Sequence, residues 1–175
     1  MSLIQGYDPD TLREQVNQRE CEVRLEEIEV QRSLPALMER VWLLKVLDRL
    51  DDALPLSEEA VRQARMAGTR KDLLRARVLH ATIMQYLGKH TAAEQELRHV
   101  ASEAEGQGWA QVAAFAHQHH GKNAYDAGDY EQARESFKRS LFLRREGGAE
   151  DRDLETALLA IEAAERRSSV EPVAI

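Results

Sequence analysis

Residues 124–143, AYDAGDYEQARESFKRSLFL, combine a glycine turn with an amphipathic helical pattern. Gly128 and Asp129 interrupt one helical pattern, and small or apolar residues follow them at spacings of three and four, which is typical of one helix face. That face consists of Tyr130, Ala133, Phe137, Ser140 and Leu141. A helix with so little apolar surface is marginal alone, so the stretch predicts a helix that packs against neighbouring helices.

The same pattern recurs with a period of 40 residues. Three alanines share one position in it: Ala53, Ala93 and Ala133. A glycine expected to end a helix in the left-handed conformation follows each alanine: Gly68, Gly108 and Gly148. A second break precedes each alanine, at Asp48, Gly88 and Gly128. Each repeat is therefore predicted to hold two helices and two turns, in units 34–73, 74–113 and 114–153.

These residues resemble the second helix of a tetratricopeptide repeat. The turn at 128–130, the small residues Ala133 and Ser140 and the aromatic Phe137 match that helix, and Gly121 stands where the first helix has its glycine. The commonest repeats of this family have about 34 residues. The longer period here is similar to that of MalT-type bacterial signalling regulators and kinesin light chains. The resemblance implies an all-α fold, a right-handed α-solenoid over residues 34–167.

The two ends of the chain do not follow the repeat. Asp8 and Pro9 are typical of a helix start, so residues 1–33 are predicted to form an acidic helix that reaches about Gln31. This helix would cap the first repeat, mediate a homodimer, connect to another domain, or lie in the groove and compete with a partner. At the other end, residues 152–167 are predicted to form a capping helix, followed by a loose tail at 168–175.

The amino-acid composition restricts the classes of partner that the chain is expected to bind. The chain has 24 basic and 31 acidic residues, a formal net charge of -7, and no basic cluster of the kind that binds nucleic acid or anionic lipid. No apolar run approaches the length of a membrane span, so we expect a cytoplasmic protein that binds neither membranes nor nucleic acid directly. Cys21 is the single cysteine, which excludes an internal disulfide and favours a small packed residue.

The stretch HQHHGKN, residues 117–123, is the strongest candidate for chemistry. His117 and His120 lie three residues apart, and His80 precedes His120 by one repeat, so a metal-binding protein is one alternative. The repeat register favours packed histidines at these positions, because the family packs its two helices together there. The lysine and glycine lack phosphate-loop spacing. We therefore expect no enzymatic activity, no metal and no cofactor.

The resemblance implies that the first helix of each repeat lines a concave groove. Its register places Phe115 there, and it selects these further candidates: Trp42, Lys45, Arg75, Thr82, Gln85, Gln118, Lys122 and Tyr125. Aromatic and basic side chains are good anchors for an acidic helix or extended peptide. The sequence thus favours an interaction module that binds a protein or peptide segment. The alternative is a ligand-sensing domain of a larger bacterial signalling or transcription regulator.

Overall fold

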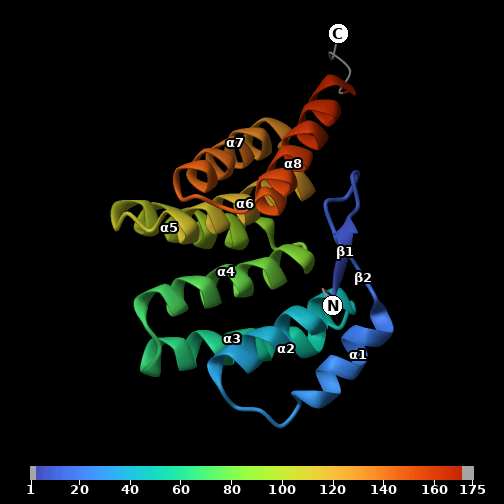
Figure 1. The fold of residues 1–175 in the computed structure, drawn as a ribbon, viewed down its shortest axis with the longest axis vertical. Coiled ribbons are helices and arrows are strands. Elements are labelled where there is room, and N and C mark those ends of the chain that lie inside the picture. The colour runs from blue at the N-terminus through green and yellow to red at the C-terminus, as the bar shows by residue number, and fades with distance from the viewer. Residues whose placement is uncertain (1–2, 171–175) are drawn as a thin grey trace.

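Helices make up most of residues 3–170, the part of the chain that the computed structural model describes (Figure 1). A short antiparallel hairpin precedes them. The elements are β1 (Ile4–Tyr7), β2 (Glu14–Val16), α1 (Gln18–Glu27), α2 (Leu34–Val46), α3 (Leu50–Ala67), α4 (Arg70–Tyr86), α5 (His90–Gly106), α6 (Ala110–Asp126), α7 (Tyr130–Glu146) and α8 (Asp151–Val170). The predicted helical class is therefore confirmed, with the hairpin as an exception within the described residues.

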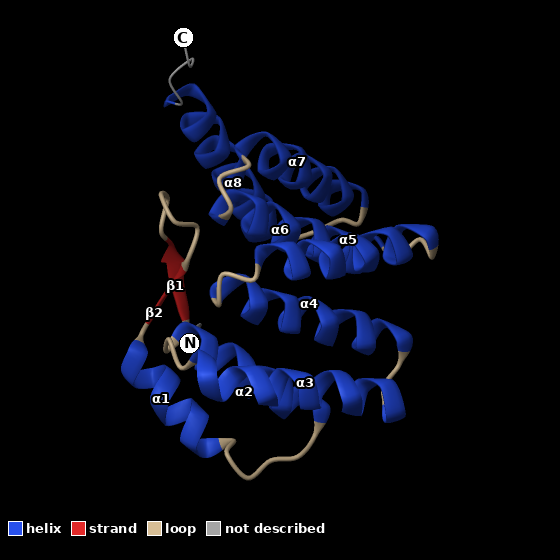
Figure 2. Cartoon of the chain, turned by 180° about the vertical axis from the view of Figure 1, so that it is seen from behind, coloured by secondary structure: helices blue, strands red, loops and turns tan. Residues whose placement is uncertain are grey.

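Helices α2 to α8 form a repeat-like stack in which each helix packs against the next along the chain (Figures 1 and 2). Helix α4 also contacts α2 and α6, so the first helices of successive pairs form a layer of their own. The second and third pairs begin at Arg70 and Ala110, four residues before the predicted unit starts at 74 and 114. Helix α8 continues to Val170, past the predicted end at 167, and residues 171–175 of the expected tail lie outside the described part.

The turns within pairs follow the predicted 40-residue period. Gly128 has φ of 84°, a left-handed conformation that glycine adopts without a steric penalty, and Asp48 adopts φ of 58° at the equivalent place. The prediction of a left-handed stop was wrong at Gly68, which has φ of -88° and ψ of 171°. The chain is extended there because Thr69 follows at once as the N-cap of α4, where it forms a capping box with Asp72.

The contact between α6 and α7 explains the glycine in the quoted histidine stretch. A Cβ atom on Gly121 would lie 2.5 Å from Cε1 of Phe137, whose side chain is fully buried. Ala133 is also fully buried on the same helix as Phe137. Gly121, which stands where the resembled family has a glycine, therefore leaves room for the aromatic ring.

The N-terminal segment differs from the prediction of one acidic helix over residues 1–33. Its first described part is the hairpin of β1 and β2, in which Tyr7 pairs with Glu14. Asp8 does not start a helix, because its Oδ1 accepts hydrogen bonds from the backbone N–H groups of Asp10 (2.9 Å) and Thr11 (2.7 Å) within the turn. An aspartate followed by proline suits a turn as well as a helix start, and here the turn is formed.

Helix α1 is the remaining helical part of this segment, and it packs on α2. Cys21 and Ile28 are fully buried in a cluster with Leu43, which confirms Cys21 as a packed residue. Arg24 adds a bidentate hydrogen bond to Glu39, with distances of 2.6 and 2.9 Å. None of the helices within residues 3–170 combines the length and apolar character needed to cross a bilayer.

Candidate functional site: a groove shared with the N-terminal hairpin

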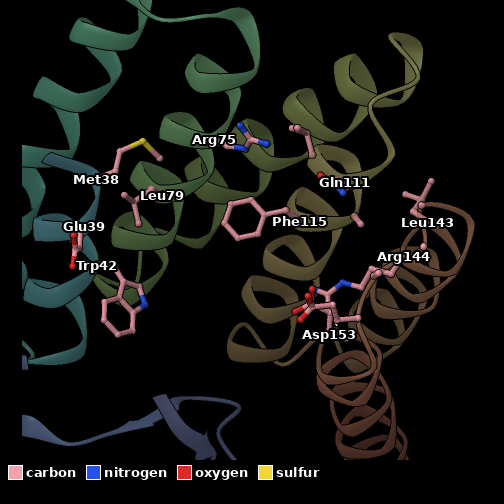
Figure 3. A pocket seen from close by; sticks show the side chains of 16 residues that line it. Met38, Glu39, Trp42, Arg75, Leu79, Gln111, Phe115, Leu143, Arg144 and Asp153 are labelled. Carbon is pink, nitrogen blue, oxygen red and sulfur yellow. Dashed lines mark hydrogen bonds between the residues drawn. The ribbon is translucent and has the colours of Figure 1, made fainter. Parts of the chain in front are cut away.

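An open cavity of about 780 Å³ lies between α2, α4, α6 and the turn that joins α7 to α8 (Figure 3). Trp42 comes from α2, Arg75 and Leu79 from α4, and Phe115 from α6, and Figure 3 shows these side chains around the same space. Phe115 is 37% exposed, which is unusual for a large aromatic side chain. The cavity therefore presents apolar surface beside a cationic group.

The charges around this cavity differ in how well they are paired. Glu39 is held by the bidentate contact with Arg24 described above. Arg144 donates a hydrogen bond to the backbone carbonyl of Asp153, and burial lowers its pKa. Arg75 lies 3.8 Å from Asp72, beyond hydrogen-bond distance, and its side chain is 43% exposed. The Arg75 guanidinium therefore retains donors that can reach an anionic group in the cavity.

The C-terminal ends of the same helices are covered by the hairpin. Glu14 Oε1 lies 2.8 Å from Lys45 Nζ, and the two side chains are only 7% and 2% exposed. The Tyr86 hydroxyl donates to Glu14 Oε2 at 3.3 Å. Burial alone would raise the pKa of Glu14, but the charges of Lys45 and Lys122 outweigh it and lower that pKa. Glu14 is thus an ionised carboxylate enclosed by the helices.

Further contacts fix the hairpin on both sides of Glu14. Lys122 Nζ lies 5.1 Å from the ring centroid of Tyr7, and burial lowers the pKa of Lys122 to about 8. Arg13 Nη2 lies 2.6 Å from Asp126 Oδ2, while its guanidinium stacks 3.8 Å from the ring centroid of Tyr86. The contacts of Lys122 with Tyr7 and of Arg13 with Asp126 join residues more than 100 positions apart in the chain.

The predicted groove residues divide into three groups. Trp42 and Arg75 line the open cavity. Four others belong to the part covered by the hairpin: Lys45, Gln85, Lys122 and Tyr125. The Tyr125 hydroxyl donates to the Asp10 carbonyl at 2.8 Å, and Gln85 donates to Asp126, the partner of Arg13, at 2.6 Å.

Thr82 and Gln118 form the third group, for which the groove assignment was wrong. Both are buried, and neither lines the cavity. Thr82 Oγ1 lies 3.1 Å from His119 Nδ1, because α6 packs against this face of α4. The 40-residue register gives positions along each helix but not the relative rotation of neighbouring helices. For the same reason it did not select Leu79, which lines the cavity although its neighbour Val78 is fully buried. Nothing in the repeat pattern marked Arg144 or Asp153, which reach the cavity from the end of α7 and the start of α8.

The histidines of the metal-binding alternative have separate partners. His80 Nδ1 lies 2.9 Å from Ser57 Oγ, His117 Nε2 lies 2.5 Å from Glu105 Oε1, and His120 Nδ1 lies 2.8 Å from Ser136 Oγ. Within residues 3–170, His, Cys, Asp and Glu side chains form no group of three or more that suits a metal ion. The structure therefore does not bring these histidines together as a candidate site.

Comparison with known proteins supports the fold alone. No protein-family model matches the sequence, and no curated protein matches it. A solved structure titled "Crystal structure of BtubC (BKLC) from P. vanneervenii" is similar, with a TM-score of 0.64 and 18% sequence identity. The similarity covers 87% of this chain and 66% of that chain, just under two thirds of its length. At this identity the likeness shows a shared helical, repeat-like fold.

Proposed function

We propose that this chain is an interaction module that binds a segment of a partner protein in the cavity between α2, α4 and α6. The observation that carries this proposal is the combination of exposed Phe115, half-buried Trp42 and weakly paired Arg75 around one open space. Aromatic and arginine side chains in a concave site are the usual anchors of protein recognition. An apolar segment with an acidic side chain complements this lining.

We further propose that the repeats are of the tetratricopeptide type. The close approach of Gly121 to Phe137 supports this assignment, as does the burial of Ala133 and Ser140 on the same helix. In that family the first helices of the repeats line the binding groove. Helices α2, α4 and α6 are the first helices here, and they line the cavity together with the end of α7, the turn after it and the start of α8.

The test is selection from a displayed library of short random peptides with the full-length chain as bait. We expect enrichment of peptides that contain apolar residues and at least one aspartate or glutamate. The selected peptides should then bind at least tenfold more weakly to the Phe115→Ala and Arg75→Glu variants, because these changes remove an anchor and reverse a charge. Failure to enrich any peptide would refute the proposal. So would variants that both bind the selected peptides as tightly as the intact chain does.

A control variant must change a charge outside the cavity without disturbing the fold. Lys45 and Lys122 were predicted groove residues, but both contact the hairpin, so reversing their charge would disturb the fold rather than test the cavity. Arg98→Glu on α5 is the better matched control for Arg75→Glu. Its side chain is 66% exposed and it is absent from the cavity lining, so binding should not change.

A further inference from the structure

The hairpin lies with one face on the helices and its β1 strand toward the cavity. Tyr7 and Glu14 pair across the two strands and share a face, and both contact helix side chains. Figures 1 and 2 show β1 between β2 and the body of the helical stack in both views. The outer edge of β1, rather than that of β2, therefore faces along α4 and α6 toward their N-terminal halves.

The backbone of β1 has N–H and C=O groups on this outer edge that can form hydrogen bonds with another strand. The Asp8 N–H donates to the Arg13 carbonyl at 2.9 Å, so Asp8 points its backbone groups toward the opposite strand. Backbone groups alternate in direction along an antiparallel strand, so the N–H and C=O of Tyr7 point away from β2. Among the backbone hydrogen bonds of the described residues, none joins β1 to a strand or helix on that side.

The spacing of strands and helix turns fits one further strand in the cavity. Neighbouring strands lie about 4.8 Å apart, and an α-helix rises about 1.5 Å per residue. Trp42 precedes Lys45 by three residues, and Phe115 precedes Lys122 by seven, which corresponds to roughly 4.5 and 10 Å along the two helices. These lengths are about one and two strand spacings, so the apolar lining begins roughly one strand spacing from the lysines that contact the hairpin and extends to about two.

We infer that the partner segment binds as a third strand added to β1, an inference that rests on the proposed function. Its backbone pairs with Tyr7, an apolar side chain enters between Trp42 and Phe115, and a carboxylate reaches Arg75. Side chains on a strand alternate between its two faces, so the apolar and acidic residues that face the cavity must be separated by an even number of positions. Strand addition to an exposed edge is a general mode of peptide recognition, with affinity from the backbone and specificity from alternate side chains.

The first experiment is an N-methyl scan of the tightest peptide recovered from the displayed library, with binding to the full-length chain measured by calorimetry. N-methylation removes one backbone donor at a time. We expect losses of roughly tenfold at every second residue across at least three consecutive positions, and small effects at the residues between them. Losses without this alternation would refute strand addition while leaving the proposed function intact. Failure to recover any peptide would refute both.

The second experiment follows the Tyr7 amide proton by hydrogen exchange in the isotope-labelled chain. Adding the selected peptide should slow exchange at Tyr7 at least tenfold. The exposed amide of Arg19 at the start of α1 serves as a control and should not change. Unchanged exchange at Tyr7 would overturn the inference. Protection of Tyr7 that rises with protein concentration and without peptide would assign the edge to a second copy of this chain, and would also overturn it.

The acidic position is tested by exchanging Asp or Glu of the selected peptide for Asn or Gln. We expect the intact chain to prefer the acidic peptide at least fivefold and the Arg75→Gln variant to show no preference. The Arg98→Gln variant, altered on α5, should keep the preference of the intact chain. A preference that survives in Arg75→Gln would show that the carboxylate lies elsewhere.

Discussion

Gly121 shows how one residue sets the distance between two helices. In Gly121→Ala the new methyl group would overlap the Phe137 ring, so we expect a loss of about 1–3 kcal/mol in the free energy of unfolding, reduced by the better helix propensity of alanine. Urea denaturation monitored by circular dichroism measures this difference. Gly106→Ala is the matched control, because no atom lies within 4 Å of its Cβ position, and it should be neutral or slightly stabilising. Equal stability of the two variants would contradict the packing argument.

Glu14 is a second residue whose role can be measured directly. Glu14→Gln leaves the Lys45 ammonium, 2% exposed, without its carboxylate, so we expect a loss of about 3–5 kcal/mol in the free energy of unfolding. The double variant Glu14→Gln, Lys45→Met should recover most of that loss. Asp52→Asn breaks an exposed pair with Arg49 and should cost at most about 1 kcal/mol. A cost for Glu14→Gln as small as that of Asp52→Asn would mean that the hairpin contact is solvated.

At the scale of elements, the N-terminal hairpin is expected to stabilise the helical stack. Deleting residues 1–16 removes Leu12, which is 3% exposed in a cluster with Ala124, and this side chain alone is worth about 1.5–3 kcal/mol. We expect the truncated chain to keep its helical circular dichroism but to melt at a lower temperature. An unchanged melting temperature would show that the hairpin contributes nothing to stability.

The same truncation removes Leu3 and Val16, which pack against the same apolar cluster as Trp42. The fluorescence emission of Trp42 should therefore shift to longer wavelength on deletion of residues 1–16. Trp109 packs in a different cluster, so a Trp42→Phe background provides the control and should show little shift. A shift of equal size in both backgrounds would indicate general loosening of the stack.

For the whole molecule, three partly or fully buried histidines predict a dependence of stability on pH. Burial lowers the pKa of His80 and His120, and it lowers the pKa of His119 well below its usual range. The Thr82 hydroxyl donates to the Val78 carbonyl, so we infer that His119 Nδ1 donates to Thr82 and that the ring is neutral. Protons therefore bind more readily to the unfolded chain as the pH falls through about 6.5. Stability should be full above that pH and decrease steadily below it.

Chemical denaturation between pH 5.5 and 7.5 measures this decrease. Lys122, whose pKa is about 8, begins to lose its proton only near the upper end of this window, so the change below pH 6.5 reports on the histidines. The window also lies above the range in which Glu14 and Glu105 are protonated, because their pKa values are lowered. His119→Gln should reduce the slope of stability against pH, whereas exposed His99→Gln should leave it unchanged. A slope that is the same in His119→Gln as in the intact chain would contradict the assignment.

The sequence by itself determined the helical pairs. The stripe around Ala133 and Phe137 and the turn at Gly128 are local signals, because helix periodicity and left-handed glycine depend on residues close together in the chain. They predicted a 40-residue period and the turns within pairs. The 40-residue register also selected Trp42 and Arg75, which line the open cavity.

Only the tertiary structure decided which of the predicted groove residues face the open cavity. Asp8 and Pro9 carry the same local signal for a helix start and for a turn, and contacts such as Arg13 to Asp126, 113 residues apart, select the turn. The rotation of α6 against α4, which buries Thr82, likewise depends on side-chain packing between helices. Whether a groove residue faces a cavity, a hairpin or another helix is therefore set by burial between distant segments, which no local pattern encodes.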